Sequence, residues 1–139
     1  MEKSGSFVLD SYALLGYLEN ESFSDHIQQV LTEAKNGHVR LYLHMIHLGE
    51  VYYITLREQG QSLADLAYSR IKAFPLKLIN YIDDELLLAA ATLKAYHPIS
   101  YADSFAAALA MINRCPLLTG DPEFDSLERE GVIAVEWLA

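Results

Sequence analysis

The chain has 139 residues, of which 52% are hydrophobic and 21% charged, and this composition excludes a disordered or fibrous protein. Its length predicts one domain, residues 1–139, which buries most of the surface that the unfolded chain exposes. The formal net charge of −9, from 19 acidic and 10 basic residues, argues against broad electrostatic capture of nucleic acid. It remains compatible with a nuclease whose acidic residues bind metal ions.

The single cysteine, Cys115, cannot form a disulfide within the chain, and its apolar neighbours predict a small buried thiol in a reducing compartment. No stretch reaches the roughly 18 apolar residues of a membrane-spanning helix, and the first residues lack the apolar core of a signal peptide. We therefore expect a cytoplasmic protein that does not enter a membrane.

Strands and helices are expected to alternate along the first half of the chain. The hydrophobic pattern predicts, in order, a strand over 6–9, a helix from Ser11, a helix capped by Ser24 and closed by Asn36 and Gly37, a strand over 40–43, and a helix over 45–59 that Gly60 stops.

The second half continues the alternation. It predicts a helix from Ser62 to about Phe74, ended by Pro75, a strand over 76–82, a helix over 86–96 after three acidic residues, an alanine-rich helix over 105–113, and strands over 116–119 and 132–135. This alternation predicts a three-layer α/β/α sandwich with a mainly parallel sheet of four or five strands.

Two acidic residues in the first half occupy unusual positions. Asp10 directly follows the first strand, and ligands bind at the carboxyl ends of parallel strands; the alternative interpretation is a helix N-cap. Glu50 shares a helical face with the apolar Ile46 and Tyr53, and a buried carboxylate there needs a cation, a proton or a route to water. The alternative for Glu50 is an ion pair with Arg57 two turns later, or contact of its carboxylate with solvent at the edge of the helix.

Two more acidic residues follow in the second half. Asp103 lies in the first turn of an otherwise apolar helix, where Ser100 three residues earlier also indicates a capping box. Asp121 lies in a tight turn after a short apolar strand. If Asp10 and Glu50 reach the same place, the four carboxylates form a pocket that suits Mg²⁺ or Mn²⁺ better than Zn²⁺, which favours cysteine and histidine ligands.

Other site motifs are missing from the sequence. There is no glycine-rich phosphate loop and no G-x-S-x-G nucleophile elbow. His47 precedes Glu50 by one turn, but the Glu-x-x-His order of di-iron bundles is reversed and not repeated. We therefore interpret His47 as a residue on the helix surface or beside the ligands, and the role of His44 stays open.

With these residues in view, the sequence resembles the PIN-domain ribonucleases, and within them the VapC-type toxins of toxin–antitoxin pairs. The resemblance covers nearly the whole chain and rests on five stretches in the family's order, residues 7–11, 48–53, 99–110, 119–124 and 131–138. One difference is His44, where many members of the family carry a small hydroxyl residue.

The resemblance implies a cytoplasmic endoribonuclease that hydrolyses RNA phosphodiester bonds with a metal-activated water. It also implies a cognate antitoxin protein as inhibitor and a homodimer as the assembled state. The catalytic residues and ligands of Mg²⁺ or Mn²⁺ would be Asp10, Glu50, Asp103 and Asp121, with Ser11 and Thr119 as candidate supporting hydroxyls.

Two other functions remain open on the sequence. One is a catalytically inactive PIN-like module that binds a protein and keeps its acidic residues as helix caps, and the low basic content favours it. The other is a metal-dependent phosphoesterase for small substrates, for which no sugar or base pocket is visible. Four clustered carboxylates repel each other, so at least one should be protonated when no metal is bound.

Overall fold

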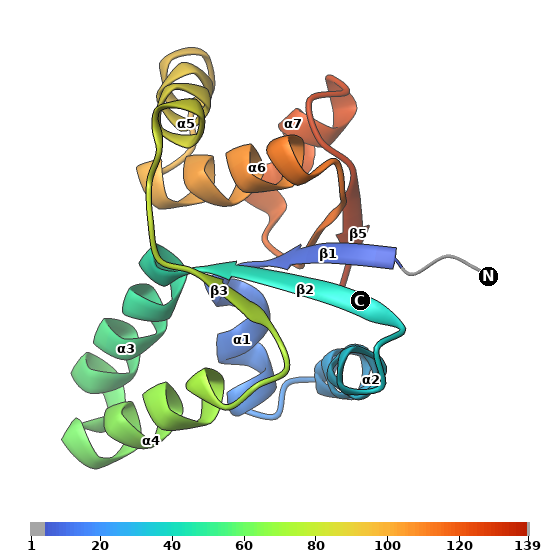
Figure 1. The fold of residues 1–139 in the computed structure, drawn as a ribbon. Helices are drawn as coiled ribbons and strands as arrows, with labels where there is room; N and C mark the ends of the chain where they lie inside the picture. Colours follow the sequence, from blue (N-terminus) through green and yellow to red (C-terminus); the bar gives the residue numbers. More distant parts are fainter. Residues whose placement is uncertain (1–4, 139) are drawn as a thin grey trace.

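The computed structural model describes residues 5–138. Within them, one sheet has five strands, all parallel, in the order β3-β2-β1-β4-β5 (Figure 1). The strands are β1 Gly5–Leu9, β2 Val39–His44, β3 Lys77–Ile79, β4 Leu117–Thr119 and β5 Val135–Trp137. The predicted parallel sheet is therefore confirmed.

Helices cover both faces of the sheet. Figure 1 shows α1 to α4 on one side and α5, α6 and α7 on the other, which is the predicted three-layer sandwich. The helices are α1 Ser11–Leu18, α2 Ser24–Lys35, α3 Met45–Gln59, α4 Gln61–Lys72, α5 Asp84–Tyr96, α6 Tyr101–Asn113 and α7 Asp125–Arg129, with a 3₁₀ turn η1 Pro122–Phe124 before α7. No helix among the described residues is both long and apolar enough to cross a membrane.

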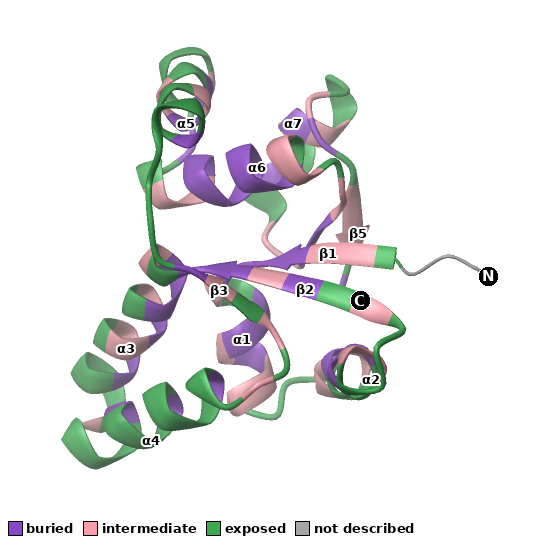
Figure 2. Cartoon of the chain, viewed as in Figure 1, coloured by how far each residue is buried: buried purple, intermediate pink, exposed green. Residues whose placement is uncertain are grey.

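The sheet separates two hydrophobic cores, because neighbouring side chains of a strand point to opposite faces. Val8 belongs to the core beneath α5, α6 and α7, whereas Leu9 belongs to the core beneath α1 to α4. Helix α6 is buried on every residue from Ser104 to Ala110, and Figure 2 shows its middle part as buried. Burial on both faces explains the continuous apolar runs of the central strands.

Three local predictions are wrong. Ser24 does not cap α2, because it is the first residue of that helix and Phe23 is at the cap position, where no side chain accepts from the helix amides. The last strand begins at Val135 instead of residue 132, because the Val132 amide still closes the preceding turn on the Leu127 carbonyl. The third strand is limited to Lys77–Ile79, and the chain then leaves the sheet and continues to α5.

The parallel arrangement determines where the acidic residues lie. The carboxyl ends of β1, β2 and β4 meet at one edge of the sheet, and the chain there turns into α1, α3 and η1. Asp10 directly follows β1, Asp121 follows β4, and Glu50 lies in the second turn of α3. The amino-terminal turn of α6, which carries Asp103, contributes the fourth acidic residue.

Candidate active site

Asp10 is the one fully buried acidic residue among the four candidates, with only 2% of its surface exposed. It caps α1, because its Oδ1 accepts a hydrogen bond of 3.0 Å from the Ala13 amide. Its Oδ2 accepts a second bond of 2.6 Å from the hydroxyl of Thr119, at the end of β4. Burial raises the pKa of Asp10 to about 7; the two hydrogen bonds oppose this shift, and the charges of Asp121 and Glu50 add to it.

Glu50 is half-buried on α3, and the hydroxyl of Ser11 donates to its Oε1 over 3.0 Å. Burial raises the pKa of Glu50; the Ser11 bond lowers it, and the charge of Asp121 raises it further. Arg57 instead lies 3.8 Å from the Glu58 carboxylate and over the ring of Tyr53. The alternative of a Glu50–Arg57 ion pair is therefore wrong, and Glu50 faces the other acidic residues.

Asp103 combines a capping arrangement with a crowded acidic environment. Its amide donates to the Ser100 hydroxyl over 3.0 Å, which is the first half of the predicted capping box. Burial raises the pKa of Asp103 to about 7, and four negative charges add to the effect, in the order Asp121, Glu123, Asp10 and Glu50. The helix cap is thus present, but it does not remove the repulsion on the side chain.

The turn after β4 is built around Thr119. Its buried hydroxyl donates to Asp10 and accepts from the Asp121 amide over 3.0 Å, so one side chain links two of the acidic residues. Asp121 in turn accepts from the Glu123 amide over 2.9 Å. A Cβ at Gly120 would lie 2.6 Å from Cε1 of Tyr12, so the Tyr12 ring would have to move to admit a larger residue there.

The structure brings one acidic residue to the site that the sequence analysis did not select. One carboxylate oxygen each from Asp103, Asp121 and Glu123 lie within 4.8 Å of one another. The spacing of Asp121 and Glu123, two acidic residues in one turn after a buried strand, was the available signal. The roles of the four selected residues as ligands and catalysts stay predictions.

The donor set fits a hard divalent cation. The three closest groups are all carboxylates, and Asp10 adds a buried one whose pKa lies far above its ordinary value. Oxygen-only donors suit Mg²⁺ or Mn²⁺, and a cation would offset the burial of negative charge and the repulsion that together raise these pKa values.

Comparison with known proteins identifies the family. A model of the PIN domain matches residues 7–130. The chain belongs to the PIN-domain family. A search of curated proteins found no match.

Solved structures of low sequence identity share this PIN fold. The VapBC2 structure from Rickettsia felis, bound to a promoter DNA fragment, has a TM-score of 0.74 at 14% identity and covers 96% of this chain and 99% of its own. DNA-bound VapBC from Salmonella typhimurium has a TM-score of 0.73 at 15% identity, with 97% and 99% covered. VapC20 of Mycobacterium tuberculosis, described as a sarcin-ricin loop cleaving toxin, has a TM-score of 0.67 at 14% identity, with 88% and 94% covered.

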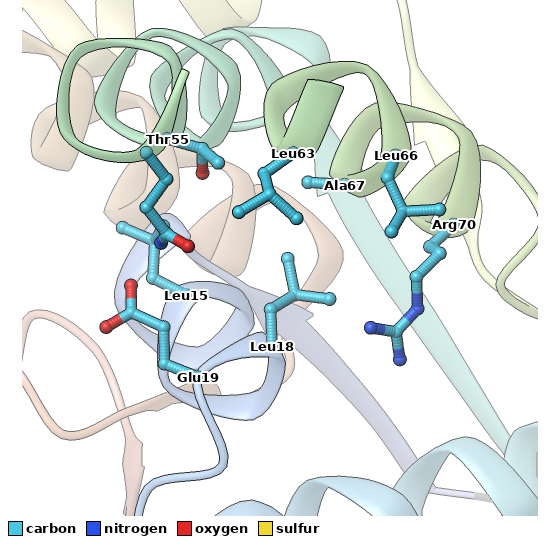
Figure 3. Close-up of a pocket in the computed structure, with 9 residues that line it drawn as sticks. Leu15, Leu18, Glu19, Thr55, Leu63, Leu66, Ala67 and Arg70 are labelled. Carbon is cyan, nitrogen blue, oxygen red and sulfur yellow. The ribbon is translucent and has the colours of Figure 1, made fainter. Parts of the chain in front are cut away.

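Away from the acidic residues, this PIN domain has an apolar groove between α1 and α4. Figure 3 shows Leu15 and Leu18 of α1 facing Leu63 and Leu66 of α4, with Glu19 and Arg70 toward opposite ends. The groove encloses about 130 Å³. Leu63 and Leu66 are 44% and 52% exposed, which leaves an apolar surface of the kind that contacts other proteins.

Proposed function

We propose that this PIN domain is a Mg²⁺- or Mn²⁺-dependent endoribonuclease and the toxin of a type II toxin–antitoxin pair of the VapC kind. The observation that carries the proposal is the convergence of acidic residues from separate elements at one edge of the sheet. Asp10 and Asp103 have pKa values near 7, raised first by burial and further by the charges of their acidic neighbours. Such perturbed groups gather at functional sites more often than elsewhere.

The acidic residues divide the work between them. Asp10, Asp103 and Asp121 would hold the metal directly or through water, and Glu50 would either bind it or orient the attacking water. A bound divalent cation would supply charge neutralisation, a water of lowered pKa and stabilisation of the negative charge that develops on the phosphate.

The supporting hydroxyls hold the carboxylates in place. Thr119 fixes one oxygen of Asp10, while the Ala13 amide fixes the other. Ser11 restricts the rotation of Glu50 in the same way. Because Asp10 and Asp103 are partly protonated near pH 7, cation binding releases protons, and the affinity for metal rises with pH.

The partners follow from the same proposal. The substrate is RNA, the inhibitor is a small cognate antitoxin, and the active form is a cytoplasmic homodimer of single-domain chains. Among the similar structures, two are described as VapBC with DNA. The apolar groove between α1 and α4 offers an antitoxin helix a surface, and the exposed Leu87 and Leu88 of α5 offer a second surface for self-association.

An RNA-cleavage assay tests the proposal. A dye-labelled single-stranded RNA is incubated with the protein and Mn²⁺, with EDTA, and with the variant Asp103→Asn. We expect cleavage by the wild type, none in EDTA, and none by Asp103→Asn, because the variant lacks one of the crowded carboxylates. Asp25→Asn, on the exposed first turn of α2, is the matched control and should cleave normally. Full activity of Asp103→Asn would remove Asp103 from the mechanism.

The second candidate is a PIN-like module that binds a protein without catalysis. The observation in its favour is that Asp10 and Asp121 both accept amide hydrogen bonds as helix caps. A module of this kind leaves RNA intact, and its melting temperature does not respond to Mg²⁺ or Mn²⁺. A metal-dependent rise in melting temperature together with RNA cleavage decides for the nuclease.

A further inference from the structure

His47 is fully buried on α3, one turn before Glu50. Its Nε2 lies 2.9 Å from the carbonyl oxygen of Ala102, the residue that precedes Asp103 on α6. Within residues 5–138, His47 Nδ1 is the one buried side-chain nitrogen or oxygen that has no hydrogen-bond partner. Of the two interpretations of His47, a position on the helix surface is therefore wrong, and a position beside the candidate ligands stays a prediction.

The contacts determine which ring nitrogen carries the proton. A carbonyl oxygen only accepts, so Nε2 of His47 must donate, and burial lowers the pKa of His47 to about 4. The ring is therefore neutral, and Nδ1 is a buried lone pair without a donor. His44 differs, because its Nδ1 accepts from the Ile46 amide and its Nε2 donates to the Tyr81 carbonyl. His44 thus uses both nitrogens, and His47 uses one.

Stability alone gives no reason for a histidine at position 47. A leucine of similar size would fill the space without burying an unpaired acceptor. What the histidine adds is a directional bond between α3 and the first turn of α6. These helices belong to the layers on opposite sides of the sheet (Figure 1), so the bond joins the two layers beyond the strand ends.

The position of this bond matters for the acidic residues. Glu50 lies one turn after His47 on α3, and Asp103 is the next residue after Ala102 on α6. The charge of Glu50 is among those that raise the pKa of Asp103, so the two side chains repel across the junction. A bond from His47 to Ala102 resists that repulsion and keeps the two helix turns in register.

We propose that His47 is a positioning residue, which sets the separation of Glu50 and Asp103 by anchoring the first turn of α6. The proposal rests on the proposed function, because it assigns these two acidic residues to one metal site. His47 itself does not contact the metal or the substrate. Its contribution is the fixed geometry of groups that come from two layers of the fold.

Three variants of the full chain test the proposal. His47→Leu removes the donor and fills the space, His47→Gln keeps an amide donor at a similar reach, and Ile71→Ala weakens the buried core of α4 far from α6. We measure the dissociation constant for Mn²⁺ by calorimetry, the melting temperature in EDTA, and the amide hydrogen exchange of residues 104–106 in EDTA.

We expect His47→Leu to raise the dissociation constant at least tenfold and to speed the exchange of the α6 amides at least tenfold. His47→Gln should stay within about threefold of the wild type on both measures. Ile71→Ala should lower the melting temperature by about 5 °C or more and leave the dissociation constant unchanged. If His47→Leu does not fold, His47→Asn replaces it, because its shorter amide cannot reach Ala102.

Three results would overturn the proposal: unchanged Mn²⁺ affinity and exchange in His47→Leu, an equal loss of affinity in Ile71→Ala, or no rescue by His47→Gln. The failure of the proposed function looks different, because the wild type itself then binds no Mn²⁺. In that case the exchange of the α6 amides still decides whether His47 anchors the helix.

Discussion

Replacing Asp10 by asparagine removes the buried charge of the site and keeps the shape of the side chain. The amide oxygen of asparagine can still accept from Ala13, and its amino group can donate to the Thr119 hydroxyl. The substitution therefore separates the charge of Asp10 from its role as a cap of α1. Without metal, we expect Asp10→Asn to unfold less readily than the wild type at alkaline pH.

The pKa of Asp10 gives the size and the sign of the effect. This pKa is about 7 in the folded protein and 3.8 as the ordinary value, so the folded state holds the proton more tightly. The contribution of the protonated Asp10 carboxyl to stability is therefore full below pH 4 and is lost as the pH rises through 7. A difference of about three pKa units corresponds to about 4 kcal/mol of unfolding free energy. The wild type should lose this amount when Asp10 ionises, and Asp10→Asn should not.

Urea unfolding in EDTA at several pH values between 4 and 8 measures this effect. The free energy of unfolding of Asp10→Asn, minus that of the wild type, should rise from near zero at pH 4 to about 4 kcal/mol at pH 8. Groups such as His47 titrate in both proteins and largely cancel in the difference. The exposed control Asp25→Asn should differ from the wild type by less than about 0.5 kcal/mol at every pH. If the difference in the free energy of unfolding between Asp10→Asn and the wild type does not change with pH, the argument that the charge of Asp10 is buried is refuted.

Three further variants test other residues of the candidate site. Thr119→Val removes the hydroxyl bond to Asp10, and urea unfolding at pH 8 should show a loss of about 1–3 kcal/mol, with a smaller loss at pH 5. Glu123→Gln removes one of three close carboxylates, so calorimetry should show about tenfold weaker Mn²⁺ binding, and melting in EDTA should occur at a higher temperature. Gly120→Ala should destabilise the wild type by about 1–3 kcal/mol but have less effect in a Tyr12→Ala background, measured as a double-mutant cycle.

The sequence was sufficient where local signals determine the structure. Helix α3 begins and ends as predicted, because the His44 side chain accepts from the Ile46 amide at one end and Gly60 has a φ of +95° at the other. The predictions for the Ser24 cap and for the start of the last strand were wrong, because local signals did not determine the structure there. Helix α2 begins one residue earlier than expected, with Phe23 at its cap position, and the Val132 amide closes a turn on the Leu127 carbonyl before the last strand can begin.

The convergence of the acidic residues could be predicted, but their contacts could not. Parallel strands bring Asp10 and Asp121 to one edge of the sheet, which needs no knowledge of side chains. The local pattern suggested Arg57 as the partner of Glu50, whereas the structure gives it Ser11, 39 residues away in the chain. The burial of His47 likewise depends on α6, which is distant in the sequence, and a helix pattern alone contains no information about it.

The same acidic residues can cap helices and bind a metal ion, because both roles follow from their position at the amino-terminal ends of helices. The acidic residues lie at the amino-terminal ends of helices, where unpaired amides and the helix dipole favour negative charge: Asp10 caps α1, and Asp103 lies in the first turn of α6. The Ala13 amide lowers the pKa of Asp10, yet burial and the charges of neighbouring acidic residues keep the pKa values of Asp10 and Asp103 near 7. The helix ends therefore help to bring the acidic residues together. An excess of negative charge remains at the site, and a divalent cation can neutralise it. A module that used these residues only as caps would not need to bring them within reach of each other.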